Sequence, residues 1–260
     1  MRFTIIHYGV MNINSNYLVK LDDIPHIIEI PVWGVLIQTG TNNILFDLGC
    51  MENIKENWEP IQVQDTPFTP VEGGIEGQLA KIELTCQDID IVIASHLHPD
   101  HYGLINKFPH CEVYVPEEEW VVAMKQSFGS IDNRLKPSGL YYYKCMSAPV
   151  KKFYFIKKEE DFDLCKGLRI ITLPGHVNNL LGIIITVDSG KTFIFPSDAV
   201  NTPKNIEPPF YLPMNCFSQK DYIQSLRKVI EIEKQYQGTI ICSHDMTSYS
   251  ELKKVPDFYN

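Results

Sequence analysis

The sequence has no surplus of positive charge and no long apolar run. Its 23 lysines and arginines are outnumbered by 32 aspartates and glutamates, which gives a formal net charge of -9 at pH 7. Nucleic acids and anionic membranes attract basic surfaces, and no lysine-rich segment or basic helix offers one. No apolar stretch approaches the ~18 residues that span a bilayer. We therefore expect neither a nucleic acid nor a membrane as a partner.

The sequence also has no closely spaced cysteine pair, and its first residues do not have the pattern of a signal peptide. The seven cysteines are odd in number, widely scattered and include no Cys-x-x-Cys pair. This distribution is typical of buried free thiols in a reducing compartment. The first residues, MRFTIIHYGV, lack the basic start and small-residue cleavage site of a signal peptide, and we expect them to form a strand. We therefore expect a cytoplasmic protein.

What the sequence does contain is a recurring unit, in which a short β-branched or aromatic run is followed by a turn with a polar residue. Such runs end at Asp47, at the segment HLHPDH (96–101), at His176, at Asp198 and at His244. Several of the runs are apolar without alternation, as in strands that are covered on both faces. Five strands are thus expected to carry Asp or His just past their carboxyl ends.

Helical patterns separate these strands. Helices are expected over Asp221–Gln237, over Glu117–Gln126 and over Gly77–Leu84. Strands that alternate with helices, with both sheet faces covered, indicate an α/β layered sandwich, here in one domain over residues 1–260. Two long irregular segments, at about residues 50–75 and 129–149, are expected to be loops or lids with a functional role.

The segment HLHPDH concentrates metal-binding side chains. Imidazoles and carboxylates suit Zn²⁺, and also iron or manganese. The histidines at positions i and i+2 share one face of an extended segment, and a tight turn brings the following Asp and His to a second position nearby. Together with the residues at three other strand ends, seven ligands are expected: His96, His98, Asp100, His101, His176, Asp198 and His244.

Seven ligands are too many for one tetrahedral ion but fit two. Two metal ions about 3.5–4 Å apart, which share a carboxylate and a hydroxide, form a common hydrolytic arrangement. The ions lower the pKa of bound water toward ~7, so that hydroxide is available without a separate strong base. The sequence therefore predicts a dinuclear hydrolytic centre.

In type and order, these residues resemble the ligands of the metallo-β-lactamase superfamily, and the resemblance covers nearly the whole chain. It implies an αβ/βα sandwich of four layers with the metals at one edge. The ligand roles that it implies are His96, His98 and His176 for one metal, Asp100, His101 and His244 for the other, and Asp198 as the bridge. Asp47 would orient a ligand imidazole.

The segments that flank the ligands resemble those of bacterial N-acyl homoserine lactone hydrolases. They are IPVWGVLIQTGTNNILFDLG, IVIASHLHPDH and SHDMTSYSELKKVPDFY, and SHDM also resembles 4-pyridoxolactonase. The resemblance implies that a metal-bridging hydroxide attacks a small-molecule lactone and that Asp100 carries a proton to the leaving alkoxide. It also implies two divalent ions, Zn²⁺ first, with iron, manganese or cobalt as alternatives, in a monomer or homodimer.

Other activities stay open on the same ligands. They are the hydrolysis of another lactone such as 4-pyridoxolactone, the hydrolysis of a thioester, and an iron-dependent oxidation such as that of a persulfide dioxygenase. Ligand types alone do not choose zinc over iron, because metal availability and geometry decide the occupant.

Three positions depart from the lactonase pattern and concern the substrate. Asn201 stands where a substrate-contacting tyrosine is usual, and its amide is, with Asp100, a candidate catalytic group. The segment PGHVNNL lacks the usual second histidine, and Pro99 stands where an aromatic residue is common. Substrate contacts are therefore expected from four aromatic residues, Trp58, Phe68, Tyr102 and Tyr211.

Overall fold

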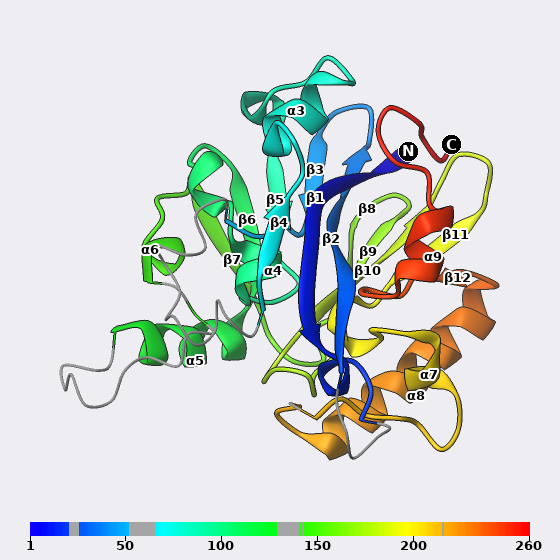
Figure 1. Cartoon of the computed structure of the whole chain (residues 1–260). Helices are drawn as coiled ribbons and strands as arrows, with labels where there is room; N and C mark the ends of the chain where they lie inside the picture. The colour runs from blue at the N-terminus through cyan, green and yellow to red at the C-terminus, as the bar shows by residue number, and fades with distance from the viewer. Residues whose placement is uncertain (21–25, 52–65, 129–140, 142, 215) are drawn as a thin grey trace.

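The computed structural model of the chain describes residues 1–20, 26–51, 66–128, 141, 143–214 and 216–260 (Figure 1). Trp58 and most of the two segments expected to be loops or lids lie outside this part of the chain.

Two β-sheets form the centre of the molecule (Figure 1). The first sheet has the spatial order β4 (Phe68–Pro70), β1 (Arg2–Asn14), β2 (Ile27–Gln38), β3 (Asn43–Phe46), β5 (Ile91–Ile93), β6 (Glu112–Pro116) and β7 (Lys152–Ile156). The second sheet has the order β12 (Thr239–Ile240), β11 (Thr192–Phe195), β10 (Leu181–Thr186), β9 (Leu168–Thr172) and β8 (Phe162–Cys165).

Helices and short turns lie between these strands. The α-helices are α3 (Gly74–Ala80), α4 (Pro99–Tyr102), α5 (Glu117–Phe128), α6 (Tyr143–Met146), α7 (Pro203–Ile206), α8 (Gln219–Tyr236) and α9 (Met246–Glu251). The 3-10 turns are η1 (Ser15–Tyr17), η2 (Cys86–Asp88), η3 (Ile105–Lys107) and η4 (Ser197–Ala199).

Apolar side chains fill three layers of core. Between the sheets, residues such as Ile37 and Phe46 of the first sheet share one buried cluster with Ile183 and Phe195 of the second. Burial of this apolar surface from both sheets provides most of the stabilisation that holds them face to face.

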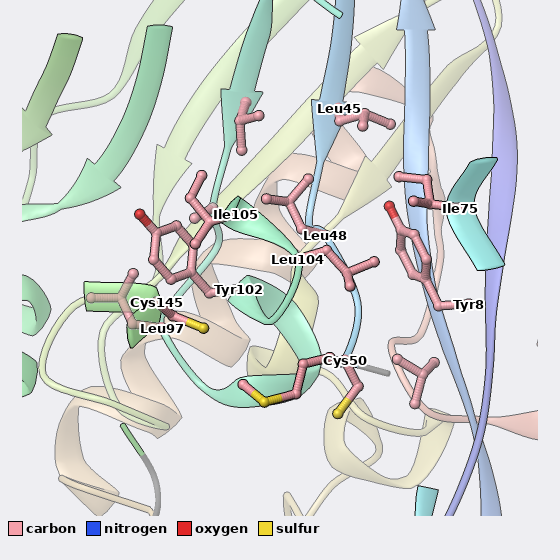
Figure 2. Close-up of a cluster of buried hydrophobic side chains, with 14 of the residues drawn as sticks. Tyr8, Leu45, Leu48, Cys50, Ile75, Leu97, Tyr102, Leu104, Ile105 and Cys145 are labelled. Atoms are coloured by element: carbon pink, nitrogen blue, oxygen red, sulfur yellow. The ribbon is translucent and has the colours of Figure 1, made fainter. Parts of the chain in front are cut away.

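The outer face of each sheet is covered as well. Figure 2 shows Leu45 of β3 in one cluster with Ile75 of α3 and Ile105 of η3, on the outer side of the first sheet. On the outer side of the second sheet, α8 buries Leu226 and Val229 against the strands. The order helix, sheet, sheet, helix confirms the αβ/βα four-layer sandwich that the resemblance implies.

Strand direction brings the polar turns to one edge of both sheets. β3 and β5 are parallel neighbours in the first sheet. β9 and β11 both run antiparallel to β10, and β12 runs parallel to β11, so these three share one direction in the second sheet. The Leu181 N–H donates to the Ser95 carbonyl at 2.8 Å and joins the two sheets at this edge. The carboxyl ends of five strands therefore meet there, as the sequence predicted.

Helix boundaries agree with the sequence to within a few residues, except for α3. α8 begins after Ser218, whose hydroxyl accepts a hydrogen bond from the Asp221 N–H. The helix expected over Gly77–Leu84 instead spans Gly74–Ala80, and Glu83 adopts a left-handed φ of 60°. A left-handed residue cannot continue a right-handed helix, so this helix ends before it.

Candidate metal centre

The seven predicted ligands lie together at the shared edge of the two sheets. Three groups each have ligand atoms within 4.8 Å of one another: His96 with His98 and His176, His96 with His101 and Asp198, and Asp100 with His101 and His244. His96 and His98 follow β5, while His176 follows β9 and Asp198 follows β11. Residues up to 148 positions apart are thus brought to one place by the topology of the sheets.

In the first group, three imidazole nitrogens face a common point. Nδ1 of His98 lies 2.9 Å from Nε2 of His96 and 3.2 Å from Nε2 of His176. A neutral imidazole has one donor and one acceptor nitrogen, so three nitrogens that face one point cannot all satisfy one another. A divalent ion accepts all three lone pairs at once, which makes this group a fitting metal site.

The two oxygens of Asp198 face different pairs of histidines. Oδ1 lies 3.1 Å from Nε2 of His244 and 3.3 Å from Nε2 of His101. Oδ2 lies 3.5 Å from Nε2 of His176 and 4.0 Å from Nε2 of His96. A carboxylate in this position can bind one ion through each oxygen.

Asp100 completes the second group. Its Oδ2 lies 3.5 Å from Nε2 of His101 and 3.8 Å from Nε2 of His244. Nε2 of His101 is buried and has no hydrogen-bond partner among the described residues. Such a group costs free energy unless something binds it. The donor set and this unpaired nitrogen therefore fit a second metal ion.

The pKa values of His98 and Asp100 favour the forms of these two side chains that bind a metal. Burial, helped by the neighbouring His176 imidazole, lowers the pKa of His98 to about 3. Burial raises the pKa of the Asp100 carboxyl, but the His101 and His244 imidazoles outweigh it and bring that pKa down to about 2. His98 is thus neutral and Asp100 ionised near neutral pH, which is the state in which each binds a metal.

Three neighbouring carboxylates raise the pKa of His101. Burial alone would lower the pKa of His101, but the carboxylates of Asp198, Asp100 and Asp47 hold it well above its ordinary value. Burial likewise raises the pKa of Asp198, but the His244 and His101 imidazoles hold it well below its usual range. Without a bound ion, His101 is therefore protonated near neutral pH and balances these carboxylates, and a metal ion that binds here displaces that proton.

Asp47 and Ser95 contact His101 at Nδ1, the ring nitrogen that faces away from the other predicted ligands. Nδ1 of His101 lies 2.8 Å from Oδ2 of Asp47, and the Ser95 N–H donates to Oδ1 of Asp47 at 2.7 Å. Asp47 adopts a left-handed φ of 62°, a region in which Asp is better tolerated than most residues. With Nδ1 occupied in this way, Nε2 of His101 is the nitrogen directed at the metal site.

His244 follows β12 of the second sheet, and contacts from the first sheet hold it in place. Its Nδ1 lies 3.1 Å from the carbonyl oxygen of Pro31, and Trp33 Nε1 donates to the carbonyl oxygen of Ser243 at 2.7 Å. Both contacts come from β2. They fix the ring of His244 so that Nε2 faces Asp198.

Three serines at the site were missed by the sequence motifs. Besides its contacts with Asp47, Ser95 accepts a hydrogen bond from Ser197 Oγ at 2.8 Å. Ser243 Oγ donates to Oδ1 of Asp198 at 2.7 Å. Each serine directly precedes a predicted ligand, in the pairs SH, SD and SH. That recurrence is the signal that could have identified them.

Asn201 and Tyr102, which we expected to act on the substrate, are close in sequence to predicted ligands, but both side chains are buried. The Asn201 side chain is 1% exposed, its amide oxygen has no hydrogen-bond partner among the described residues, and its carbonyl accepts from the His244 N–H at 3.0 Å. Tyr102 is also 1% exposed, and Figure 2 shows its ring among Leu97, Ile105 and Cys145.

The placement of Tyr102 differs from what we expected for a substrate contact. Successive helix residues turn by about 100°, so Asp100 and Tyr102 lie on nearly opposite sides of α4. Asp100 therefore faces the metal site while Tyr102 enters the apolar core, where its hydroxyl is buried without a hydrogen-bond partner among the described residues. A hydroxyl enclosed in this way reaches a substrate only if the core rearranges.

The other two described aromatic residues pack against the same core. The ring of Phe68 covers Gly9 of β1, where a Cβ atom would come within 2.9 Å of it. Tyr211 is partly buried, and its carbonyl accepts a hydrogen bond from Nδ2 of Asn205 at 2.7 Å. Trp58 lies outside the described residues.

A cavity of about 540 Å³ lies between the segments that contain Leu18, Thr202 and Asp245. Leu18, Val19 and Ile28 provide its apolar lining. Thr202 and Asp245, which directly follow Asn201 and His244, also line it. Two of its lining residues are thus sequence neighbours of Asn201 and His244, and its size lies within the range of small-molecule sites.

The sequence model of the Metallo-beta-lactamase superfamily matches residues 28–244, which include all seven predicted ligands. The chain belongs to the metallo-β-lactamase superfamily. It is accordingly a metal-dependent hydrolase, and the superfamily binds divalent metals through His and Asp groups of the kind described above.

Two N-acyl homoserine lactonases are similar to the chain over most of its length. It is 24% identical over 240 residues to the N-acyl homoserine lactonase AiiB of Rhizobium rhizogenes, which covers 90% of this chain and 86% of the relative. It is 23% identical over 237 residues to the N-acyl homoserine lactonase AiiA of Bacillus thuringiensis subsp. kurstaki, which covers 89% and 88%.

Solved structures of two lactone hydrolases share the fold. An N-acyl homoserine lactone hydrolase with the product N-hexanoyl-L-homoserine bound at its catalytic metal centre superposes with a TM-score of 0.85 at 20% identity, over 99% of this chain and 98% of that one. AidC, a dizinc quorum-quenching lactonase, gives a TM-score of 0.66 at 17% identity, over 98% of this chain and 92% of that one.

Among the helices of the described ranges, none has the length and apolar character that a membrane span requires.

The contact between Asp47 and His101 gives a first prediction for this superfamily member. Replacement of Asp47 by asparagine puts an amide where His101 Nδ1 and Ser95 Oγ now meet a carboxylate, so the orientation of the imidazole is no longer fixed. Loss of such a supporting contact typically weakens metal binding by about 10–100-fold. Competition with a chromogenic chelator measures the change. Asp163→Asn, an exposed site, is the control, and equal metal affinity in Asp47→Asn and wild type would contradict the role.

Proposed function

We propose that the chain is a dinuclear metal hydrolase that opens lactone rings, with N-acyl homoserine lactones as the leading substrate class and residues 1–260 as one catalytic domain. The observation that carries this proposal is the position of Asp198, whose two oxygens face two separate sets of histidines. The lactonase relatives, at 23–25% identity, support the substrate class.

The proposed ligands follow from the groups in the structure. His96, His98 and His176 would hold one ion, and Asp100, His101 and His244 would hold the other, with Asp198 between them. When bound, two such ions supply a hydroxide nucleophile and a Lewis acid for the carbonyl oxygen. We propose Zn²⁺ as the occupant, because nitrogen-rich sites with carboxylates suit it; iron, manganese and cobalt are also compatible.

Asp100 is proposed to move the proton of the reaction. Its carboxylate is ionised at neutral pH, since its pKa is about 2. Its side chain is 17% exposed, more than that of Asp198 at 8%, so it is the carboxylate of the pair that a substrate reaches more readily. Asp100 can take a proton as the nucleophile attacks and return it to the alkoxide that leaves when the ring opens.

Asn201 is proposed as a second catalytic group; its side chain is 1% exposed, so its amide reaches a substrate only when the turn around it opens. Asn201 occupies the turn after η4, and its amide is the nearest replacement in sequence for the usual tyrosine donor. The cavity lined by Leu18, Val19 and Ile28 offers apolar surface to an acyl chain, while Thr202 and Asp245 offer polar groups at its edge. A small-molecule site commonly combines apolar surface with polar groups that orient the ligand.

The purified protein assayed on a panel of lactones, thioesters and phosphodiesters tests this function. We expect hydrolysis of lactones, with two equivalents of metal per chain, and turnover of N-acyl homoserine lactones above that of a bicyclic aromatic lactone. Turnover of a thioester with none of any lactone would overturn the substrate class. Oxygen consumption with an iron-loaded protein would instead support an oxidoreductase.

A further inference from the structure

Two of the proposed metal ligands, His98 and His176, lack the hydrogen bond that fixes the ring of the other histidines. His101 and His244 are each held through Nδ1, by Asp47 and by the Pro31 carbonyl. In contrast, Nδ1 of His176 is buried and has no hydrogen-bond partner among the described residues. His98 directs Nδ1 at the other imidazoles, and within the described part of the chain no hydrogen bond to its Nε2 is found. Metal-binding histidines are almost always fixed by a second contact, so these two need another source of rigidity.

Glu119 contacts both a residue beside His98 and the loop that carries His176. It stands in the first turn of α5 and is 1% exposed. Its Oε1 accepts a hydrogen bond from the Tyr141 hydroxyl, and its Oε2 accepts one from the Asn178 N–H at 3.2 Å. One buried carboxylate therefore joins three segments that are far apart in the chain.

Each of these two contacts leads to one of the unsupported histidines. The ring of Tyr141 lies against the ring of His98, with 5.8 Å between centroids. Asn178 is two residues from His176, so the bond to Glu119 fixes the loop that carries this imidazole. The neighbouring Glu118 adds to this, since Nδ2 of Asn179 donates to it at 2.9 Å.

We propose that Glu119 is a positioning residue of the metal centre, which fixes His98 through the ring of Tyr141 and His176 through the backbone of Asn178. The proposal rests on the proposed metal site and extends it to a residue outside the ligand set. It also gives Asn178 and Asn179 a role, because these two residues after His176 are held by the first turn of α5. Burial raises the pKa of Glu119 to about 7, and the two bonds that it accepts favour its ionised form.

The test compares Glu119→Ala, Glu119→Gln and Tyr141→Phe with wild type. The amide of Gln can accept from Asn178 and donate to the Tyr141 oxygen, whereas Ala can do neither. We expect Glu119→Ala to weaken the binding of Zn²⁺ by about 10–100-fold, as loss of supporting contacts typically does. Glu119→Gln is expected to stay within about threefold of wild type, and Tyr141→Phe to fall between the two. Glu117→Ala, two residues before Glu119 and partly exposed, is the matched control and should bind as wild type does.

Two further readouts separate positioning from a general loss of structure. The visible spectrum of the Co²⁺-loaded protein reports the geometry of the imidazole ligands, and we expect it to change in Glu119→Ala and Tyr141→Phe but not in Glu119→Gln. The melting temperature of each metal-free variant shows whether the fold is kept. If Glu119→Ala does not fold, Tyr141→Phe decides, because it removes a single hydroxyl and leaves the ring in place.

The outcomes distinguish this inference from the proposed function. A wild-type protein that binds two metals and opens lactones, beside Glu119→Ala and Tyr141→Phe variants with unchanged Zn²⁺ affinity and Co²⁺ spectrum, overturns the role of Glu119 alone. The same holds if Glu119→Gln loses as much affinity as Glu119→Ala, since the hydrogen bonds would then not matter. A wild-type protein that binds no metal overturns both.

Discussion

Replacement of Asp198 by asparagine is expected to lower kcat/KM for lactone hydrolysis by about a thousandfold. Both oxygens of this carboxylate face imidazole nitrogens at 3.1 to 4.0 Å, so a neutral amide can serve at most one of the two proposed ions. Metal-assisted charge stabilisation contributes several kcal/mol to such reactions, and about 1.4 kcal/mol corresponds to a factor of ten.

Metal content and kinetics measure this prediction together. Elemental analysis is expected to show about two equivalents of metal in wild type and one or fewer in Asp198→Asn. Asp163→Asn is the control, because its carboxylate is exposed and pairs only with Arg169 among the described residues. An Asp198→Asn variant that keeps both metals and more than a tenth of the activity would show that Asp198 is not the bridge.

Removal of the metal is expected to stop hydrolysis and to lower the melting temperature by about 10 °C. A ligand that binds only the folded state stabilises it by about 4 kcal/mol at a thousand times its Kd. For a chain of roughly this size, 1 kcal/mol corresponds to about 2–4 °C. In addition, the carboxylates of Asp100 and Asp198 and five imidazoles would be left without the ions between them.

Calorimetry of the protein before and after dialysis against a chelator measures the shift. Zn²⁺ added back should restore both the melting temperature and the activity, and a chelator saturated with metal is the control for the chelator itself. Asp198→Asn should show a smaller shift than wild type, because it has less metal to lose. Full hydrolysis by a protein that has lost all of its metal would exclude the proposed mechanism.

Much of the fold and of the ligand set could be predicted because each depends on short-range patterns. The alternation of β-branched runs with amphipathic helices indicates the layers, and α8 was expected to within two residues at its N-terminus. His96, His98, Asp100 and His101 lie within six positions, and the remaining ligands each follow a strand. Since parallel strands end at a common edge, their polar turns could be placed together without coordinates.

The supporting contacts could not be predicted in this way. Glu119 in an acidic first turn has the pattern of a solvated helix start, yet it is buried and accepts two hydrogen bonds from distant segments. Tyr102 was expected at the substrate, but the turn of α4 directs it into the core. Neither outcome has a local signal, because burial depends on which segments pack over a residue.

The sequence by itself determined the superfamily, the layered α/β architecture and the identity of the seven candidate ligands, because these depend on residue type, spacing and strand-end position. Only the tertiary structure decided which oxygen of Asp198 faces which histidines and which nitrogen of His101 and His244 is directed at the metal site. It also decided that Glu119 and Tyr141 lie beside His98 and the loop of His176. Hydrogen bonds act over about 3 Å, so these details depend on packing between segments that are separated by tens to hundreds of residues.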